Sequence, residues 1–244
     1  MRNGILAASL FSCLFAWSAP PAAAAEATSA IIDLTWKLSL DANGRVQELS
    51  TTDERVPKLH ARLEKAIRGW QFSPGKLNGT PAATRTALHT RIEVNLAKDR
   101  DRFEVRLLAA STGPTYGKIR APVYPTWAAS KRIDGVVVLV ASYDERGRVT
   151  DVTPYEHAVG AAAVKELQST AVSAVRRWTF EPEVVDGHAI AGRALVPVCF
   201  AVAGGRSNAC DWKDAAGDGE IRGNQAIALD SVAGIDPDVI GRVL

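Results

Sequence analysis

Residues 178–182 read Trp-Thr-Phe-Glu-Pro, and residues 70–74 read Trp-Gln-Phe-Ser-Pro. Upstream lies a second matching pair, in which residues 144–149 read Asp-Glu-Arg-Gly-Arg-Val and residues 41–46 read Asp-Ala-Asn-Gly-Arg-Val. Single residues also correspond, namely Gly79 with Gly187 and Arg85 with Arg193. Because the order and approximate spacing are kept, with about five extra residues in the second copy, we interpret the chain as a duplication.

The second copy has a simple order of predicted elements. Residues 135–143 form a valine-rich extended run, residues 144–147 a turn, and residues 148–155 a second extended run that completes a hairpin. Residues 161–177 show the apolar spacing of one helix face. The positions that carry this spacing are Val164, Leu167, Ala171, Val172 and Val175. A last strand is predicted at residues 193–202.

The first copy shows the same order. Its hairpin is predicted at residues 31–40 and 46–52, its helix at 56–68 and its last strand at 86–96, and residues 102–110 add a strand between the copies. The predicted fold class is therefore α+β, with two tandem β-β-α-β units that each form an antiparallel sheet with one helix packed across it.

Composition and charge are those of an ordinary globular protein. Of 244 residues, 47% are hydrophobic, and 29 lysines and arginines balance 27 acidic residues. A charge balance so close to zero gives no electrostatic reason to expect nucleic acid or an anionic membrane surface as a partner.

The N-terminus has the pattern of an export signal. Arg2 precedes an apolar run, and Pro20 and Pro21 end that run before four alanines. We therefore assign residues 1–25 to a signal peptide and exclude them from the fold. Two alternatives remain open, namely an uncleaved membrane anchor and a lipoprotein cleavage site at Cys13. If the signal is cleaved, no membrane span is expected.

Two cysteines remain after such a cleavage, Cys199 and Cys210. An even number of cysteines in an exported chain favours a disulfide, which stabilises by roughly 2–3 kcal/mol for a loop of this length. Two free thiols or a metal pair are the alternatives.

The sequence offers no constellation for catalysis. The four histidines, His60, His89, His157 and His188, lack the spacing of zinc sites, and the serines lack a nucleophile elbow. Residues 214–225 resemble a calcium loop only in part, and we interpret them as an acidic loop. We expect no metal, no cofactor and no enzymatic activity, and a short helix at residues 226–232 within the tail.

The second copy carries further motif residues before its hairpin. Taken together, these positions are Pro122, Tyr124, Pro125, Gly147, Trp178, Phe180 and Pro182. In this order, residues 122–200 resemble the C-terminal domain of the TonB family. The domains are accordingly a divergent TonB-like domain at 26–110, a TonB C-terminal-like domain at 118–203 and a tail with the disulfide loop at 204–244.

This resemblance implies a periplasmic domain in a Gram-negative bacterium, with a role in transport. Its last strand would pair with an extended segment of a protein or peptide, such as part of an outer-membrane transporter or a membrane-assembly component. The implied edge positions are Arg193, Leu195, Val196, Val198 and Phe200. The chain has no long proline-rich spacer, so we expect a soluble binding protein. The alternatives are a membrane-anchored energy transducer and an unrecognised enzyme.

Overall fold

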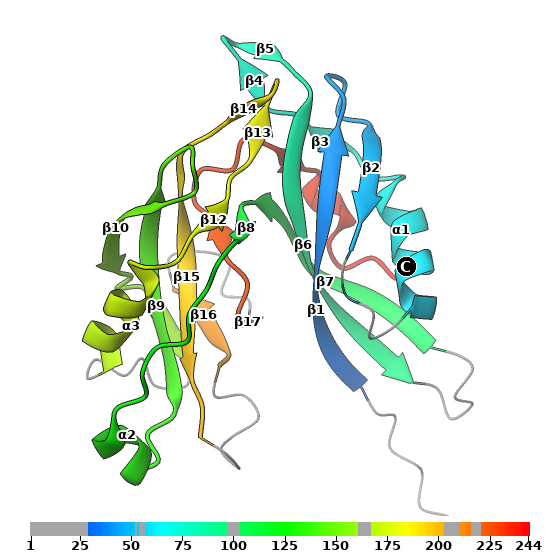
Figure 1. Ribbon diagram of the computed structural model, residues 1–244. Helices are drawn as coiled ribbons and strands as arrows, with labels where there is room; N and C mark the ends of the chain where they lie inside the picture. Colours follow the sequence, from blue (N-terminus) through cyan, green and yellow to red (C-terminus); the bar gives the residue numbers. More distant parts are fainter. Residues whose placement is uncertain are drawn as a thin grey trace, which may run out of the picture.

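The computed structural model describes residues 29–51, 53, 57–96, 103–160, 167–202, 210–215 and 221–244. Two antiparallel sheets lean toward each other, and each carries a helix on its outer face (Figure 1). The predicted mixed fold with antiparallel sheets and few helices is therefore confirmed. The predicted signal peptide at residues 1–25 lies outside the described residues.

The first sheet is built from four main strands and one helix. These are β1 (Ser29–Leu40), β2 (Val46–Ser50), β6 (Thr84–Leu96), β7 (Phe103–Gly113) and α1 (Pro57–Ile67). β1 and β6 pair without a register shift along their shared length. Because side chains alternate between the faces of a strand, Leu34, Trp36 and Leu38 of β1 all face the helix.

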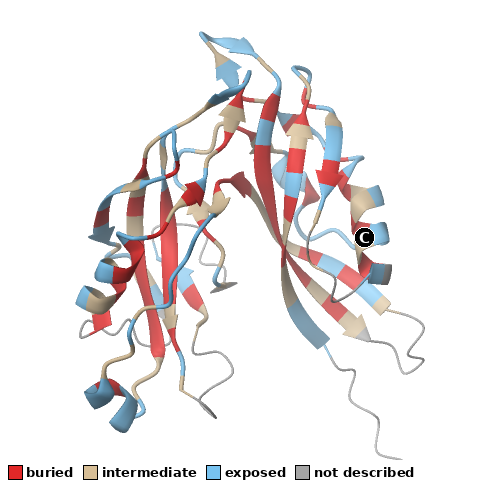
Figure 2. Cartoon of the chain, in the orientation of Figure 1, coloured by how far each residue is buried: buried red, intermediate tan, exposed pale blue. Residues whose placement is uncertain are grey.

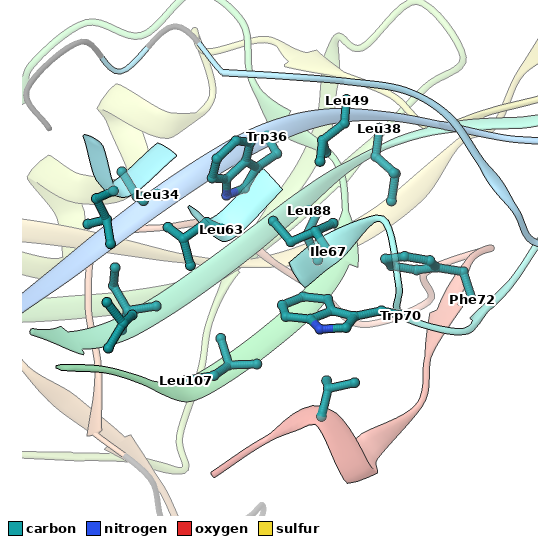
Figure 3. Packing of buried hydrophobic residues seen from close by; sticks show 14 of the residues in the cluster. Leu34, Trp36, Leu38, Leu49, Leu63, Ile67, Trp70, Phe72, Leu88 and Leu107 are labelled. Atoms are coloured by element: carbon teal, nitrogen blue, oxygen red, sulfur yellow. The ribbon is translucent and has the colours of Figure 1, made fainter. Parts of the chain in front are cut away.

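The core of the first sheet is packed between that face and α1. Leu63 and Ile67 of the helix are fully buried there, and Trp70 and Phe72 close its end (Figure 3). The indole Nε1 of Trp36 donates to Thr90 Oγ1 at 3.2 Å, so this buried polar group is satisfied.

In the second sheet, a hairpin and a helix precede the last long strand along the chain. Its elements are β9 (Gly135–Tyr143), β10 (Val149–Pro154), α3 (Gln168–Val175), β15 (Gly192–Phe200) and β18 (Ile227–Ala228). The order across the sheet is β10-β9-β15-β18. β9 has the predicted bounds. Of the helix predicted at residues 161–177, residues 161–166 lie outside the described residues, and α3 covers Gln168–Val175.

β9 is buried along almost its whole length, while β1 alternates between buried and exposed residues (Figure 2). The reason is that the second sheet is covered on both faces. One face packs against α3, and the other packs Val136, Val138 and Leu195 against Trp212 of the tail. A strand covered on both faces reads as a continuous apolar run.

Short elements connect and extend the two sheets. They are β3 (Phe72–Ser73), β4 (Lys76–Leu77), β5 (Thr80–Pro81), β8 (Thr115–Tyr116), α2 (Thr126–Ser130), β11 (Ala158–Gly160), β12 (Phe180–Glu181), β13 (Val184–Val185), β14 (His188–Ala189), β16 (Trp212–Asp214), β17 (Ile221–Arg222), β19 (Gly234–Ile235) and the 3-10 helix Pro237–Val239. No helix within the described residues is long and apolar enough to cross a membrane.

The tail connects the two halves of the molecule. β18 pairs with β15 of the second sheet, whereas β19 pairs with β3 of the first half. The last residues run along β7, where Leu244 N donates to Val105 O at 2.8 Å. The short helix predicted at residues 226–232 is wrong, because Ile227 and Ala228 form the strand β18, which pairs with β15.

A second connection joins the halves through Glu183, which is only 3% exposed. Its carboxylate accepts hydrogen bonds from Thr86 of β6 at 2.7 Å and from Ser231 and Val232 of the tail at 3.0 and 2.9 Å. The neighbouring hairpin β13–β14 adds to β6, with Val184 opposite Arg85.

Candidate partner-binding edge of the second sheet

The hairpin turn of the second sheet depends on Gly147, which has a φ of 73°. A Cβ placed there would lie 2.0 Å from the carbonyl oxygen of Phe180. The two backbones lie this close because they are hydrogen-bonded: Phe180 N donates to Gly147 O at 2.7 Å. Glycine is therefore required both by the backbone conformation and by the lack of space.

Asp144 closes the same turn. Its carboxylate accepts from the main-chain N–H of Arg146 and Arg148, and from Arg148 Nε at 2.8 Å. The side-chain hydrogen bond from Arg148 is the main cause that lowers the pKa of Asp144, and the main-chain N–H of Arg148 adds to it.

The aromatic motif residues fasten the helix end to the sheet. Trp178 is buried, and its Nε1 donates to Arg120 O at 2.8 Å. Phe180 stacks on Tyr143 with ring centroids 4.8 Å apart. The δ carbon of Pro182 would lie 3.3 Å from a Cβ on Gly147. The contacts of these three residues are those of core packing.

The Pro122-Val123-Tyr124-Pro125 segment lies at the far end of the last strand. Tyr124 packs on Phe200 with ring centroids 5.8 Å apart, and its hydroxyl donates to Ile133 O. Pro125 precedes α2 as its N-cap residue, and Pro122 is half-buried. The segment thus holds the end of β15 in place.

β15 pairs with β9 along its whole length, from Gly192 opposite Tyr143 to Phe200 opposite Gly135. Its other side is the candidate edge. Arg193 O accepts from Leu229 N at 2.9 Å on this outer side. Since successive residues of a strand direct their main-chain groups to alternate sides, Leu195, Pro197 and Cys199 also face outward.

This alternation divides the five residues that the sequence assigned to the edge. Arg193 and Leu195 present main-chain groups outward, whereas the N–H and C=O groups of Val196, Val198 and Phe200 face β9. The side chains of these last three residues are buried in the second core. A proline at Val198 would therefore break the sheet itself rather than test the edge.

The outer side is partly occupied by the tail. β18 places Ala228 opposite Ala194 and Ile227 opposite Leu195, and no other strand of the described residues pairs beyond Leu195 on this side. Pro197 contributes a carbonyl but no N–H there. Cys199 is joined to Cys210 by the predicted disulfide, which is confirmed.

An ion pair reinforces the occupied part of the edge. Arg193 donates from Nε and Nη2 to the carboxylate of Asp230 at 2.8 and 3.0 Å. The hydrogen bond between them lowers the pKa of Asp230 and raises the pKa of Arg193. Asp230 carries no signal of this role in the sequence, because its partner Arg193 is distant along the chain.

A pocket of about 430 Å³ lies between the first sheet and the tail, next to His89, Tyr116 and Gln225. His89 Nε2 lies 2.9 Å from Pro114 O and therefore donates to it, while Nδ1 lies 3.2 Å from the Thr35 hydroxyl. Burial lowers the pKa of His89. Both ring nitrogens are engaged in the fold. Within the described ranges, no group of three His, Cys, Asp or Glu side chains is placed to hold a metal ion.

Comparison with known proteins gives a consistent assignment for the second half. Residues 120–202 match the family model described as the Gram-negative bacterial TonB protein C-terminal. The chain is 32% identical over 95 residues to Protein TonB from each of two strains of Xanthomonas campestris pv. campestris, covering 39% of this chain and 41% of each relative. It is 26% identical over 83 residues to Protein TonB of Vibrio cholerae serotype O1, covering 34% of this chain and 32% of that relative.

The chain thus spans less than half the length of these curated relatives. The matched range leaves residues 31–96 outside it, and no solved structure matches the chain. The resemblance seen in residues 122–202 is confirmed by the family model.

Proposed function

We propose that this chain, whose residues 120–202 are a TonB C-terminal domain, is a non-catalytic periplasmic protein that binds an extended protein segment by strand pairing. One observation carries the proposal. The last strand of the matched domain, β15, has an outer edge on which no described strand pairs beyond Leu195. An unpaired strand edge is a template for another chain.

We propose two copies of one β-β-α-β unit, at residues 26–110 and 118–203, followed by a tail at 204–244. Gly44 supports the first copy, because its φ of 78° and a Cβ distance of 1.9 Å to Phe72 O reproduce the surroundings of Gly147.

Strand addition would use the main chain of the second half of β15. A partner strand could donate to the Pro197 carbonyl and exchange both main-chain hydrogen bonds with Cys199, since these two residues face outward. The side chains that flank this edge are mostly buried in the sheet. Affinity would therefore come mainly from main-chain bonds, with selectivity from the partner's alternate side chains.

The family match also supports a non-catalytic role in the Gram-negative envelope. The partner would be an extended segment of an outer-membrane transporter, as the resemblance implies, or of a membrane-assembly component. The TonB-type transducer alternative would need an N-terminal anchor, and that segment lies outside the described residues.

Photo-cross-linking in cells followed by peptide binding tests the proposal. A photoreactive residue at Ala201, exposed just after β15, should yield a specific adduct, while one at the exposed Thr150 on β10 should not. A peptide from the adduct should lose binding when N-methylated at every second residue, because methylation removes the N–H that pairs with β15. Equal tolerance of all N-methyl positions would exclude strand pairing.

A further inference from the structure

β18 lies where a partner strand would begin. It is paired with β15 at only two positions, Ala194 and Leu195, and extended by the hydrogen bond from Leu229 N to Arg193 O at 2.9 Å. We propose that residues 226–230 of the tail occupy the outer edge of β15, where the partner strand would pair. We also propose that the partner strand carries the same pattern of side chains as these residues. This inference rests on the proposed function.

The surroundings of the tail strand define that pattern. Ala226 is 1% exposed within the second core, and Ile227 packs against the cluster that contains Trp212. The Cβ of Ala228 lies against Gly113 of β7, so close that a Cβ added at Gly113 would be 2.7 Å away, and a larger side chain at position 228 would meet β7. Leu229 is 40% exposed, so its surroundings place little restriction on the side chain at the corresponding position of a partner.

The acidic position follows from the charge on the edge. Arg193 and Asp230 form a two-pronged pair with side chains that are 55% and 48% exposed. A surface pair of this kind is exchangeable, since water competes for both groups. The expected partner segment therefore reads small, apolar, small, unrestricted, acidic, running antiparallel to β15.

The tail has other attachments that remain when β18 leaves. β19 pairs with β3, and Leu244 bonds to Val105 of β7. A partner that supplies the same main-chain bonds and the same carboxylate replaces β18 contact for contact. Because the two sets of contacts are equivalent, a small difference in affinity between the partner strand and β18 is enough to decide which of them occupies the edge.

The probe is a labelled synthetic peptide with the sequence of residues 224–232, added to the full chain. Leu229→Pro removes the N–H that bonds to Arg193 and should raise peptide affinity by about tenfold, the value of one main-chain hydrogen bond. Leu229→Ala keeps that N–H and is the matched control, with no expected change. Asp230→Asn, at an exposed position, should raise affinity by a smaller factor.

The acidic position is tested from the other side. Arg193→Ala in the Leu229→Pro chain should weaken peptide binding, and changing the peptide's aspartate to asparagine should do the same. If Leu229→Pro and Asp230→Asn both leave peptide affinity unchanged in folded protein, residues 226–230 of the tail do not occupy the edge where the partner strand would pair. That result would leave the cross-linking from Ala201 unaffected. Peptide binding that responds to these substitutions without a cellular adduct would overturn the proposed function and the partner's pattern, and would leave only the pairing of the tail with the outer edge of β15.

Discussion

The last strands of the two halves, β6 and β15, differ in what lies on their outer sides. β6 is covered by β7 from Ala87 to Leu96 and by β13 at Thr84 and Arg85. β15 is covered by β18 at two residues only. In both halves a hairpin and a helix precede the last strand. The difference therefore comes from the segments that follow each last strand.

The segments that follow the two last strands cover their outer sides to different extents. In the first half, β7 is the next strand along the chain after β6 and pairs with its outer side. In the second half, a disulfide joins Cys199 of β15 to Cys210, and β18 of the tail pairs with only part of the outer edge of β15. The partly covered edge of β15 is where we propose that a partner strand pairs.

The largest expected effect concerns the two hairpin turns. Gly147→Ala and Gly44→Ala should each lower the free energy of unfolding by about 2–4 kcal/mol, because each adds a Cβ against a phenylalanine carbonyl at positive φ. Urea unfolding measures the change.

Gly187→Ala and Gly79→Ala are the matched controls for the turn substitutions. Their φ values are 80° and 82°, and nothing lies within 4 Å of an added Cβ. They should cost only about 1 kcal/mol, the contribution of backbone conformation alone. If Gly44→Ala lowered the free energy of unfolding as little as Gly79→Ala, the turns that contain Gly44 and Gly147 would not be equivalent.

The next effect separates the two last strands. Replacing Cys199 and Cys210 by serine should lower the free energy of unfolding by roughly 2–3 kcal/mol, because the unfolded chain is no longer constrained by the loop. Hydrogen exchange should show the loss of protection in β15 and not in β6. Equal loss in both strands would mean that the halves do not differ in how their last strands are held.

The sequence predicted the regular strands because their signals are local. The valine-rich run of β9 and the alternation of β1 gave bounds close to those observed. The segment at residues 226–232 gave no such signal, because its extended form depends on β15, a strand distant in sequence. The hairpin β13–β14 gave no strand signal either, since its pairing with β6 is also distant in sequence.

The candidate site was predicted in part for the same reason. The choice of β15 came from the family motif, but the direction of each main-chain group depends on pairing parity. Arg193 and Val198 look equivalent in the sequence, yet one faces outward and the other faces β9. Only the observed register with β9 and β18 distinguishes them.

A smaller effect concerns the connection between the halves. Glu183→Gln should cost about 1–2 kcal/mol, because the buried carboxylate accepts from Thr86, Ser231 and the main chain of Val232. The exposed Glu181 of the neighbouring strand provides the control, as Glu181→Gln should change stability little. A larger cost for Glu181→Gln would exclude Glu183 as the main polar link.

The smallest effect distinguishes the two turns by their charge. Asp144 accepts from the Arg148 side chain, whereas Asp41 Oδ2 accepts from Gln47 Nε2 at 3.3 Å. Because the pKa of Asp144 is lowered in the folded protein, its interaction is present above the ordinary carboxyl range and is lost as the pH falls through the folded pKa. NMR titration of the Asp144 carboxyl should show a low pKa that rises toward its ordinary value in Arg148→Gln. Arg146→Gln is the matched control, since only the main-chain N–H of Arg146 bonds to Asp144; an equal rise there would exclude the Arg148 side chain as the cause.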